Sequence, residues 1–412
     1  MNHKLRQLKL ACYTANATMS VVASLSPVLF ITFRSLYGFS YSLLGLLVLI
    51  NFVTQLTVDL IFSFFSHRFN IPATLRFMPI LAVFGLAFYA LSPVLFPHHI
   101  YLGLAFGTVL FCASSGLAEV LLSPVIAAIP AKDPDREMSK LHSVYAWGTV
   151  GVILVSTLFL LVFGNENWPV LAFLFLLIPL ISAIVFAGAP IPQMETPEKV
   201  SGALSFFKNK WLLLSVLAIF LGGAAECSMA QWSSSYLEQA LGIPKVWGDV
   251  FGVALFSVAL GLGRTLYAKF GKNLGKIITL GAIGTVICYL ICAISPWPIL
   301  GLAACALTGF CTSMLWPGNL VLATDRFPTG GVFIFAMMAA GGDLGASVAP
   351  QLIGIITDTA IATSAIANLA TGLNLSPEQL GMKLGMLLAM LFPLTAIPLY
   401  RHIWKNNISK TS

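Results

Sequence analysis

The side chain with the clearest potential for chemistry is Glu119, an acid inside the apolar run from Tyr101 to Leu122. A carboxylate near the middle of a bilayer costs about 2.5–3.5 kcal/mol on insertion scales, so it calls for a partner, a water-accessible cavity or a proton. Burial favours the neutral form, which could carry a proton or hydrogen-bond a hydroxylated solute. The structural alternative is an acid paired with another helix. We predict that Glu119 couples transport to protons.

A second group of functional side chains begins with Glu226, which shares one apolar run with Gln231 and Trp232. Its other members lie in two further runs. Hydrogen-bonding groups beside flat aromatic rings suit a sugar or polyol, whose hydroxyls and C–H faces they match. Amides can equally join helices within lipid, and a tryptophan at a helix end can be an interface anchor rather than a cavity floor. The predicted substrate-binding residues are Glu226, Gln231, Trp232, Trp316, Asn319, Asn51 and Gln55.

A third group is predicted to have gating or structural roles. Asp343 lies among glycines that permit close helix approach, so it could line the pathway or bond a neighbouring backbone. Asp59 is expected to be a structural acid that holds helix ends together. His142 is either a gate residue that titrates or a hydrogen-bonded residue at the start of a helix. The group consists of Asp59, Arg68, His142, Trp147, Arg264 and Asp343.

The elements that position these residues follow from composition. The chain is 58% hydrophobic and 9% charged, with a mean hydropathy of +0.91. Its apolar runs recur at the length that spans a bilayer, and lipid requires each span to satisfy its own backbone as a helix. We therefore predict an all-α membrane protein with about twelve transmembrane helices.

Basic residues indicate the orientation of these spans. Of the 22 Lys and Arg residues, all but Arg34, Lys245 and Lys383 fall in loops on one predicted side. The positive-inside rule then places both termini and the central linker in the cytoplasm. The net charge of +7 is explained by this bias, so the sequence does not predict a nucleic-acid partner.

The chain divides into two similar halves. Residues 190–210 form the one long polar segment between spans, which predicts an N-terminal six-helix bundle over residues 1–189 and a C-terminal bundle over residues 211–412. Three positions of the first half recur in the second at one constant offset: Gly116, Pro124 and Gly148 recur as Gly309, Pro317 and Gly341. Pseudo-symmetric six-helix units of this kind build many secondary transporters, with the substrate site near the midplane.

These features resemble the major facilitator superfamily. Within it, Glu119 followed by Ser123 and Pro124 is similar to the Glu-x-x-x-Asn-Pro signature of the fucose permease branch, which consists of sugar:proton symporters. The resemblance implies a sugar or related polyol as substrate and protons as the coupling ion. Two departures matter. His67-Arg68 stands where the superfamily usually has Asp-Arg, and the first helix has Ser24 to Pro27 where the branch has an acid.

Missing motifs exclude other functions. The sequence has no nucleotide-binding Gly-x-x-x-x-Gly-Lys-Ser/Thr loop and no Cys/His cluster or nucleophile motif, so it predicts no ATP drive, no cofactor, no metal site and no enzyme. It also lacks the Gly-Pro-x-x-Gly-Gly run of superfamily drug antiporters, which favours uptake over efflux. All seven cysteines lie in apolar spans and are expected to pack as free thiols.

The sequence thus predicts a secondary active transporter that moves a small polar solute by alternating access, coupled to protons. We expect a multi-pass, monomeric protein in a bacterial cytoplasmic membrane, whose partners are its solute, protons and lipid. Two alternatives stay open: a proton-antiport exporter of drugs or metabolites, and a transport-inactive sensor or lipid-handling protein.

Overall fold

The computed structural model describes residues 3–65, 68–129, 134–191, 209–327 and 331–411. This part of the chain is helical, with no strand. Eleven helices are long and apolar enough to cross a membrane, or twelve if α1 and α2, which meet at a 46° bend, form one span. The predicted all-α fold of about twelve spans is therefore confirmed. The cytoplasmic placement of the termini stays a prediction.

Contacts divide the chain into two compact units. Unit 1 comprises Met1–Ser26 and Ile50–Ser201, and unit 2 comprises Pro27–Leu49 and Gly202–Ser412. The bundle boundaries predicted from sequence stay a prediction, and most of the predicted linker, residues 192–208, lies outside the described residues. Residues 27–49 follow the first span in the chain and pack within unit 2, so they are described with it.

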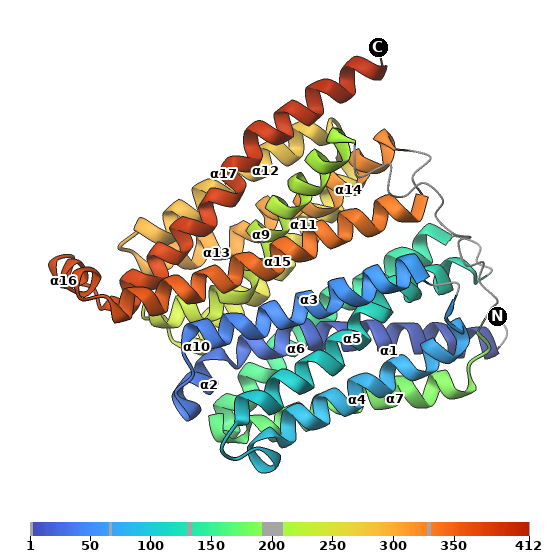
Figure 1. Cartoon of the computed structure of the whole chain (residues 1–412), viewed down its shortest axis with the longest axis horizontal. Helices are drawn as coiled ribbons and strands as arrows, with labels where there is room; N and C mark the ends of the chain where they lie inside the picture. The colour runs from blue at the N-terminus through green and yellow to red at the C-terminus, as the bar shows by residue number, and fades with distance from the viewer. Residues whose placement is uncertain (1–2, 66–67, 130–133, 192–208, 328–330, 412) are drawn as a thin grey trace. The chain divides into compact units, whose positions relative to one another are not determined.

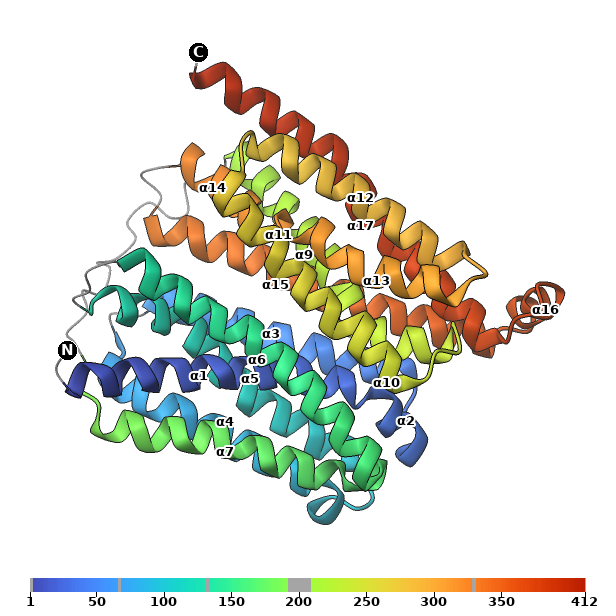
Figure 2. The same ribbon diagram turned by 180° about the vertical axis from the view of Figure 1, so that it is seen from behind.

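Unit 1 is built from long helices around an apolar core. Its elements are α1 (His3–Val28), the second part of α3 (Tyr41–Phe65), α4 (Ile71–Leu95), α5 (Ile100–Ala127), α6 (Pro134–Phe163), η2 (Asn165–Asn167) and α7 (Trp168–Gly188). Helices α4 and α7 run side by side (Figures 1 and 2). The α4–α5 contact is close because Gly85 and Gly107 face each other's backbone, and a Cβ on Gly85 would stand 2.5 Å from the nitrogen of Phe111.

Unit 2 contains more interrupted helices. Its elements are α2 (Phe30–Tyr37), the first part of α3, α9 (Lys210–Gln239), α10 (Lys245–Trp247), the π-helix η3 (Gly248–Ala254), α11 (Leu255–Phe270), α12 (Leu274–Ile294), α13 (Pro298–Thr312), α14 (Leu315–Arg326), α15 (Gly331–Ala362), α16 (Ser364–Gly372) and α17 (Pro377–Thr411). Helices α12 and α17 run alongside each other (Figures 1 and 2). One predicted span is broken between α13 and α14.

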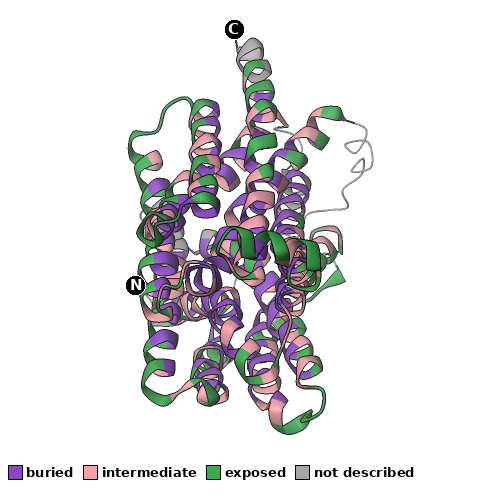
Figure 3. Cartoon of the chain, turned by 90° about the vertical axis from the view of Figure 1, so that its left-hand side faces the viewer, coloured by how far each residue is buried: buried purple, intermediate pink, exposed green. Residues whose placement is uncertain are grey.

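Burial follows the pattern expected in lipid. Most helices have one buried and one exposed face, and the loops and helix ends are largely exposed (Figure 3). Large apolar side chains are common on the exposed faces, among them Phe84 at 55% and Ile184 at 66% exposure. Because hydrocarbon rather than water would contact these surfaces, such exposure is consistent with a membrane-spanning chain.

The three basic residues predicted on the outer side each have a partner in unit 2. Arg34 forms an ion pair with Glu378 at 3.1 Å, and Lys245 forms one with the buried Asp249 at 2.8 Å. Lys383 donates to the carbonyls of Ala293 and Ser295 at the end of α12. These exceptions to the charge bias thus have specific contacts.

Candidate functional site

The first candidate region is the crossing of α3 and α5 in unit 1. The helices approach at Gly116, where a Cβ would stand 3.1 Å from Val58 and 3.2 Å from Oδ1 of Asp59. Glu119 follows Gly116 by one helical turn, is exposed, and interacts electrostatically with Asp59. The structure therefore brings together two acids that the sequence analysis treated separately.

Asp59 is an unusual member of this pair. Its side chain is 2% exposed, and within the described residues neither carboxylate oxygen has a hydrogen-bond partner. Among the described residues, no cationic side chain is paired with Asp59 or Glu119. Two carboxyl groups in such surroundings cannot both carry a charge cheaply, so the arrangement is suited to holding a proton.

The amides predicted to bind substrate on α3 lie in the same helix contact. Gln55 donates to Oδ1 of Asn51 at 2.6 Å, and the thiol of Cys112 on α5 donates to the same oxygen at 2.9 Å. Asn51 and Gln55 are only 5% and 8% exposed. In this conformation they join α3 to α5, with Asp59 continuing the same stripe one turn further.

The second candidate region is an ion pair in unit 2. Arg264 on α11 donates from Nη2 to Oε1 of Glu226 on α9 at 3.2 Å. The Arg264 side chain is 42% exposed, whereas that of Glu226 is 13% exposed. The second oxygen of Glu226, Oε2, is buried and has no hydrogen-bond partner among the described residues. The pair is therefore only half satisfied on the carboxylate side.

A two-residue interruption within the span Pro298–Ala323 holds Arg264 in place. Helix α13 ends at Thr312 and α14 begins at Leu315, which removes part of the helical hydrogen bonding between them. The carbonyl of Ser313 in this break accepts from Nε of Arg264 at 3.1 Å. Discontinuous spans whose backbone groups face a site are typical of transporter binding sites.

An aromatic surface lies beside the ion pair. The ring of Trp316, half-buried on α14, covers Gly223 of α9 and Gly342 of α15, whose added Cβ atoms would stand 2.9 and 2.4 Å from it. Asp343 follows Gly342 and is 4% exposed. These two glycines allow the ring to lie directly on both helices, one turn from Glu226.

Three other predicted substrate-binding residues are packed in unit 2. Trp232 has no exposed surface, and its indole Nε1 donates to the carbonyl of Pro350 at 2.9 Å. Gln231 is 6% exposed, and Asn319, at 3%, donates to the carbonyl of Leu315. None of the three side chains presents a free face in this conformation.

The remaining predicted gating residues are Arg68, between α3 and α4, and Trp147 and His142, within α6. Arg68 lies with its guanidinium over the ring of Phe65 at 5.5 Å. Trp147 on α6 is 70% exposed, as an interface anchor would be. His142 is also on α6, but its side chain lies outside the described part of the structure.

A charged cluster that the sequence analysis did not identify joins the start of α3 to α15 and α17. The carboxylate of Asp358 accepts from the backbone nitrogens of Tyr41 and Ser42 at 3.0 and 2.7 Å, so α15 caps α3. Glu378 accepts from the hydroxyl of Tyr41 at 2.5 Å and pairs with Arg34. One hint of this cluster was visible in the sequence, because Arg34 is an exception to the charge bias.

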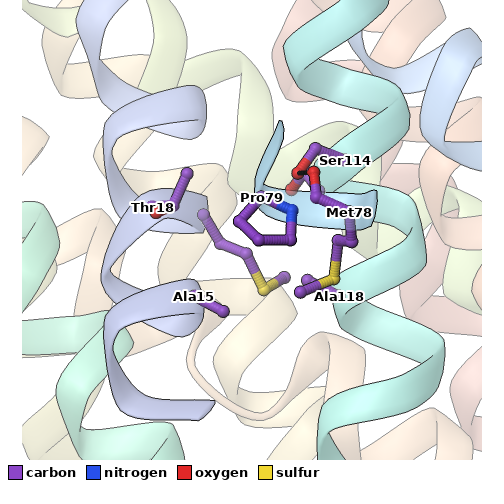
Figure 4. Close-up of a pocket in the computed structure, with 8 residues that line it drawn as sticks. Ala15, Thr18, Met78, Pro79, Ser114 and Ala118 are labelled. Atoms are coloured by element: carbon purple, nitrogen blue, oxygen red, sulfur yellow. Dashed lines mark hydrogen bonds between the residues drawn. The ribbon is translucent and has the colours of Figure 1, made fainter. Parts of the chain in front are cut away.

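The pocket drawn in Figure 4 is a different feature. It lies in unit 1 among α1, α4 and α5, and Thr18, Pro79, Ser114 and Ala118 are among its lining residues. Its interior is too narrow for a water-sized sphere. It therefore offers no space for a solute in this conformation.

Comparisons with known proteins agree with this architecture. Residues 11–350 match the Major Facilitator Superfamily. The cis,cis-muconate transport protein of Acinetobacter baylyi is 27% identical over 272 residues, which cover 61% of this chain and 65% of that protein. The chain thus matches slightly less than two thirds of this relative's length.

Solved structures share the fold at low sequence identity. A nucleoside transporter, NupG, aligns with a TM-score of 0.69 at 12% identity, covering 97% of this chain and 99% of that one. A D-xylose-proton symporter aligns at 0.66 and 15%, covering 96% and 98%. The E. coli fucose:proton symporter FucP aligns at 0.59 and 14%, covering 96% and 99%. The chain belongs to the Major Facilitator Superfamily and is a multi-pass membrane transporter.

Proposed function

We propose that the protein imports a small polar solute, with a sugar or related polyol as the first candidate, by proton-coupled alternating access in a bacterial cytoplasmic membrane. The structural neighbours include proteins described as D-xylose-proton and fucose:proton symporters, so the shared fold is compatible with this solute class. Because their sequence identity is low, these neighbours inform only the fold. The assignment of proton coupling and solute binding must therefore rest on residues of this chain. We propose that it works as a monomer.

The observation that carries the proposal is the acid pair of unit 1, for which the described residues provide no cation. Glu119 is exposed, whereas Asp59 beside it is buried and its oxygens have no hydrogen-bond partner among those residues. A proton on the pair removes the cost of enclosing a charge in a closed cavity. Protonation would therefore favour closure around the solute.

The solute would contact the half-exposed groups of unit 2. Glu226, Arg264 and Trp316 combine hydrogen-bonding groups with an aromatic face. Trp232 would have to release the carbonyl of Pro350 before it could contact a solute, so it suits a state reached later in the cycle.

The cluster of Arg34, Tyr41, Asp358 and Glu378 is proposed as the gate. It joins the first turn of α3 to α15 and α17 through two backbone hydrogen bonds and an ion pair. Such contacts between elements far apart in the chain can form and break as a unit, which a closing and opening cavity requires.

The test is solute-dependent proton uptake by Glu119→Gln protein in proteoliposomes. D-xylose, L-fucose and a nucleoside serve as probes, with a pH-sensitive dye inside the vesicles. The unmodified protein should accumulate a probe when the outside is acidic, and the variant should lose this accumulation while still exchanging the probe across the membrane. Exchange persists because it needs no net proton movement.

Glu166→Gln is the matched control, since Glu166 is an exposed acid in η2 between α6 and α7. It should behave like the unmodified protein. Unchanged pH-driven accumulation by Glu119→Gln would show that this acid does not couple protons, and absence of flux for every probe would argue against the sugar class.

Organic acids are a second candidate solute class. The relative from Acinetobacter baylyi is described as a cis,cis-muconate transport protein. A carboxylate-bearing solute also matches the exposed guanidinium of Arg264.

A further inference from the structure

We infer that Arg264 binds a carboxylate of the transported solute and that Glu226 occupies this place when no solute is bound. The inference rests on the proposed transport function and deepens it, because it assigns the solute to the organic acids. A sugar acid would satisfy both the hydroxyl-binding and the carboxylate-binding groups.

The guanidinium of Arg264 is held in an orientation that leaves one side available. Nε donates to the carbonyl of Ser313, which fixes the plane of the group at the break between α13 and α14. Nη2 donates to Glu226, while Nη1 has no partner among the described residues. With 42% of the side chain exposed, Nη1 and Nη2 together present the two parallel donors that a carboxylate accepts.

Glu226 holds Arg264 weakly. Only Oε1 contacts the guanidinium, at 3.2 Å, whereas charge-assisted pairs of this kind are usually about 2.7–2.9 Å apart. Oε2 makes no hydrogen bond to any described residue. A solute carboxylate that bonds both Nη atoms would therefore form the better pair and displace Glu226.

A displaced Glu226 would lose its one cation. Arg264 on α11 is the charged group that acts on Glu226, and Asp343 on α15 and Arg264 both act on the neighbouring Cys227. The hydroxyls of Tyr289 on α12 and Tyr400 on α17 donate to the carbonyls of Ala225 and Ala218 on the same helix as Glu226. Among these groups only Arg264 is cationic. Without Arg264, Glu226 would be a buried charge with no partner, so we expect it to take up one proton as one solute carboxylate binds.

This exchange makes solute binding electroneutral. The solute brings one negative charge to Arg264, and the proton removes one from Glu226. Trp316 lies one turn from the break that holds Arg264, so its ring offers an apolar face to the body of the same solute. A flat or ring-shaped organic acid fits these groups best.

Binding to the detergent-solubilised protein tests the inference without requiring flux. Three carboxylates are compared with neutral counterparts by calorimetry: D-glucuronate with D-glucose, benzoate with benzyl alcohol, and succinate with 1,4-butanediol. At least one carboxylate should bind, its counterpart should not, and affinity should fall several-fold between about pH 6 and pH 8 as proton uptake becomes harder.

Two variants separate the roles. Glu226→Gln frees Arg264, so carboxylate binding should tighten and lose its pH dependence. The double variant Arg264→Gln/Glu226→Gln removes both charges together, so no acid is left buried alone, and it should weaken carboxylate binding by about tenfold or more. Arg76→Gln, on the exposed face of α4, is the control and should bind normally.

The outcomes distinguish the inference from the proposed function. Carboxylate binding that the double variant retains, or no binding of any carboxylate to the unmodified protein, would overturn the inference. Proton-driven uptake of a neutral sugar by the double variant would also overturn it while leaving the transport cycle intact. Carboxylate binding that needs Arg264 without any flux would support the site and count against the transport cycle.

Discussion

Unit 1 and unit 2 each bury an acid, but the side chain beside that acid is different in the two units. In unit 1, Asp59 lies beside a second acid, Glu119, with no cation paired to either among the described residues. In unit 2, Glu226 is paired with a half-exposed arginine. The first arrangement can become neutral only by taking up a proton, whereas the second can become neutral by exchanging one anion for another.

This difference suggests that the two units have different roles in transport. A carboxyl pair without a cation has no group that would hold a negatively charged solute, and an acid bound to an arginine has a ready competitor in any carboxylate. Unit 1 is therefore suited to proton coupling and unit 2 to solute recognition. Three measurements test the contrast, from the largest expected effect to the smallest.

Removing the cation of unit 2 should give the largest loss of stability. Arg264→Gln leaves Glu226 buried without a partner, and we expect the free energy of unfolding to fall by roughly 2 kcal/mol at neutral pH. This is below the value for a fully buried pair because the guanidinium is 42% exposed. Thermal unfolding in detergent measures it. Arg76→Gln serves as control, and equal melting temperatures for the two variants would contradict the pairing.

Removing the buried acid of unit 1 should have the opposite sign. Asp59→Asn keeps the shape but removes the cost of an unpartnered carboxylate, so we expect stabilisation by about 1 kcal/mol. Thermal unfolding in detergent measures the change, and a variant less stable than the unmodified protein would contradict the contrast between the units.

The smallest effect is expected at the proposed gate, where both carboxylate oxygens of Asp358 accept hydrogen bonds. Asp358→Asn weakens the cap on Tyr41 and Ser42, which should cost about 0.5 kcal/mol locally and speed hydrogen exchange of these amides about twofold. Mass spectrometry of the peptide around residue 41 measures this rate. Asp325→Asn, an exposed acid at the end of α14, should leave it unchanged. Identical rates in both variants would show that the cap does not hold α3.

The helical architecture could be predicted because lipid imposes it. Backbone groups in hydrocarbon must be satisfied within each span, so apolar runs of bilayer length predict helices directly. The superfamily was identified by the resemblance of the two six-helix halves and their linker to known members, and it is confirmed. Only the helical spans themselves could be predicted from composition and spacing alone.

The arrangement within the site could not be predicted, because it depends on how each helix is rotated about its axis. Asp59 and Glu119 meet because α3 and α5 approach at Gly116, and a glycine alone does not reveal which helix packs on it. Arg264 contacts Glu226 while the carbonyl of Ser313, between α13 and α14, holds its guanidinium, and composition does not show this interruption. Trp232 has the chemistry of a sugar-binding residue, but its indole already bonds Pro350 in this conformation.

The ion pair between Arg34 and Glu378 has a consequence for how the chain is made. The two residues are separated by 344 positions, so a ribosome delivers the arginine long before its partner. The cell inserts Arg34 while it is still alone, and the favourable contact forms only after the last span has been synthesised. Nascent chains truncated before Glu378 would lack this ion pair and should be preferred targets of membrane proteases.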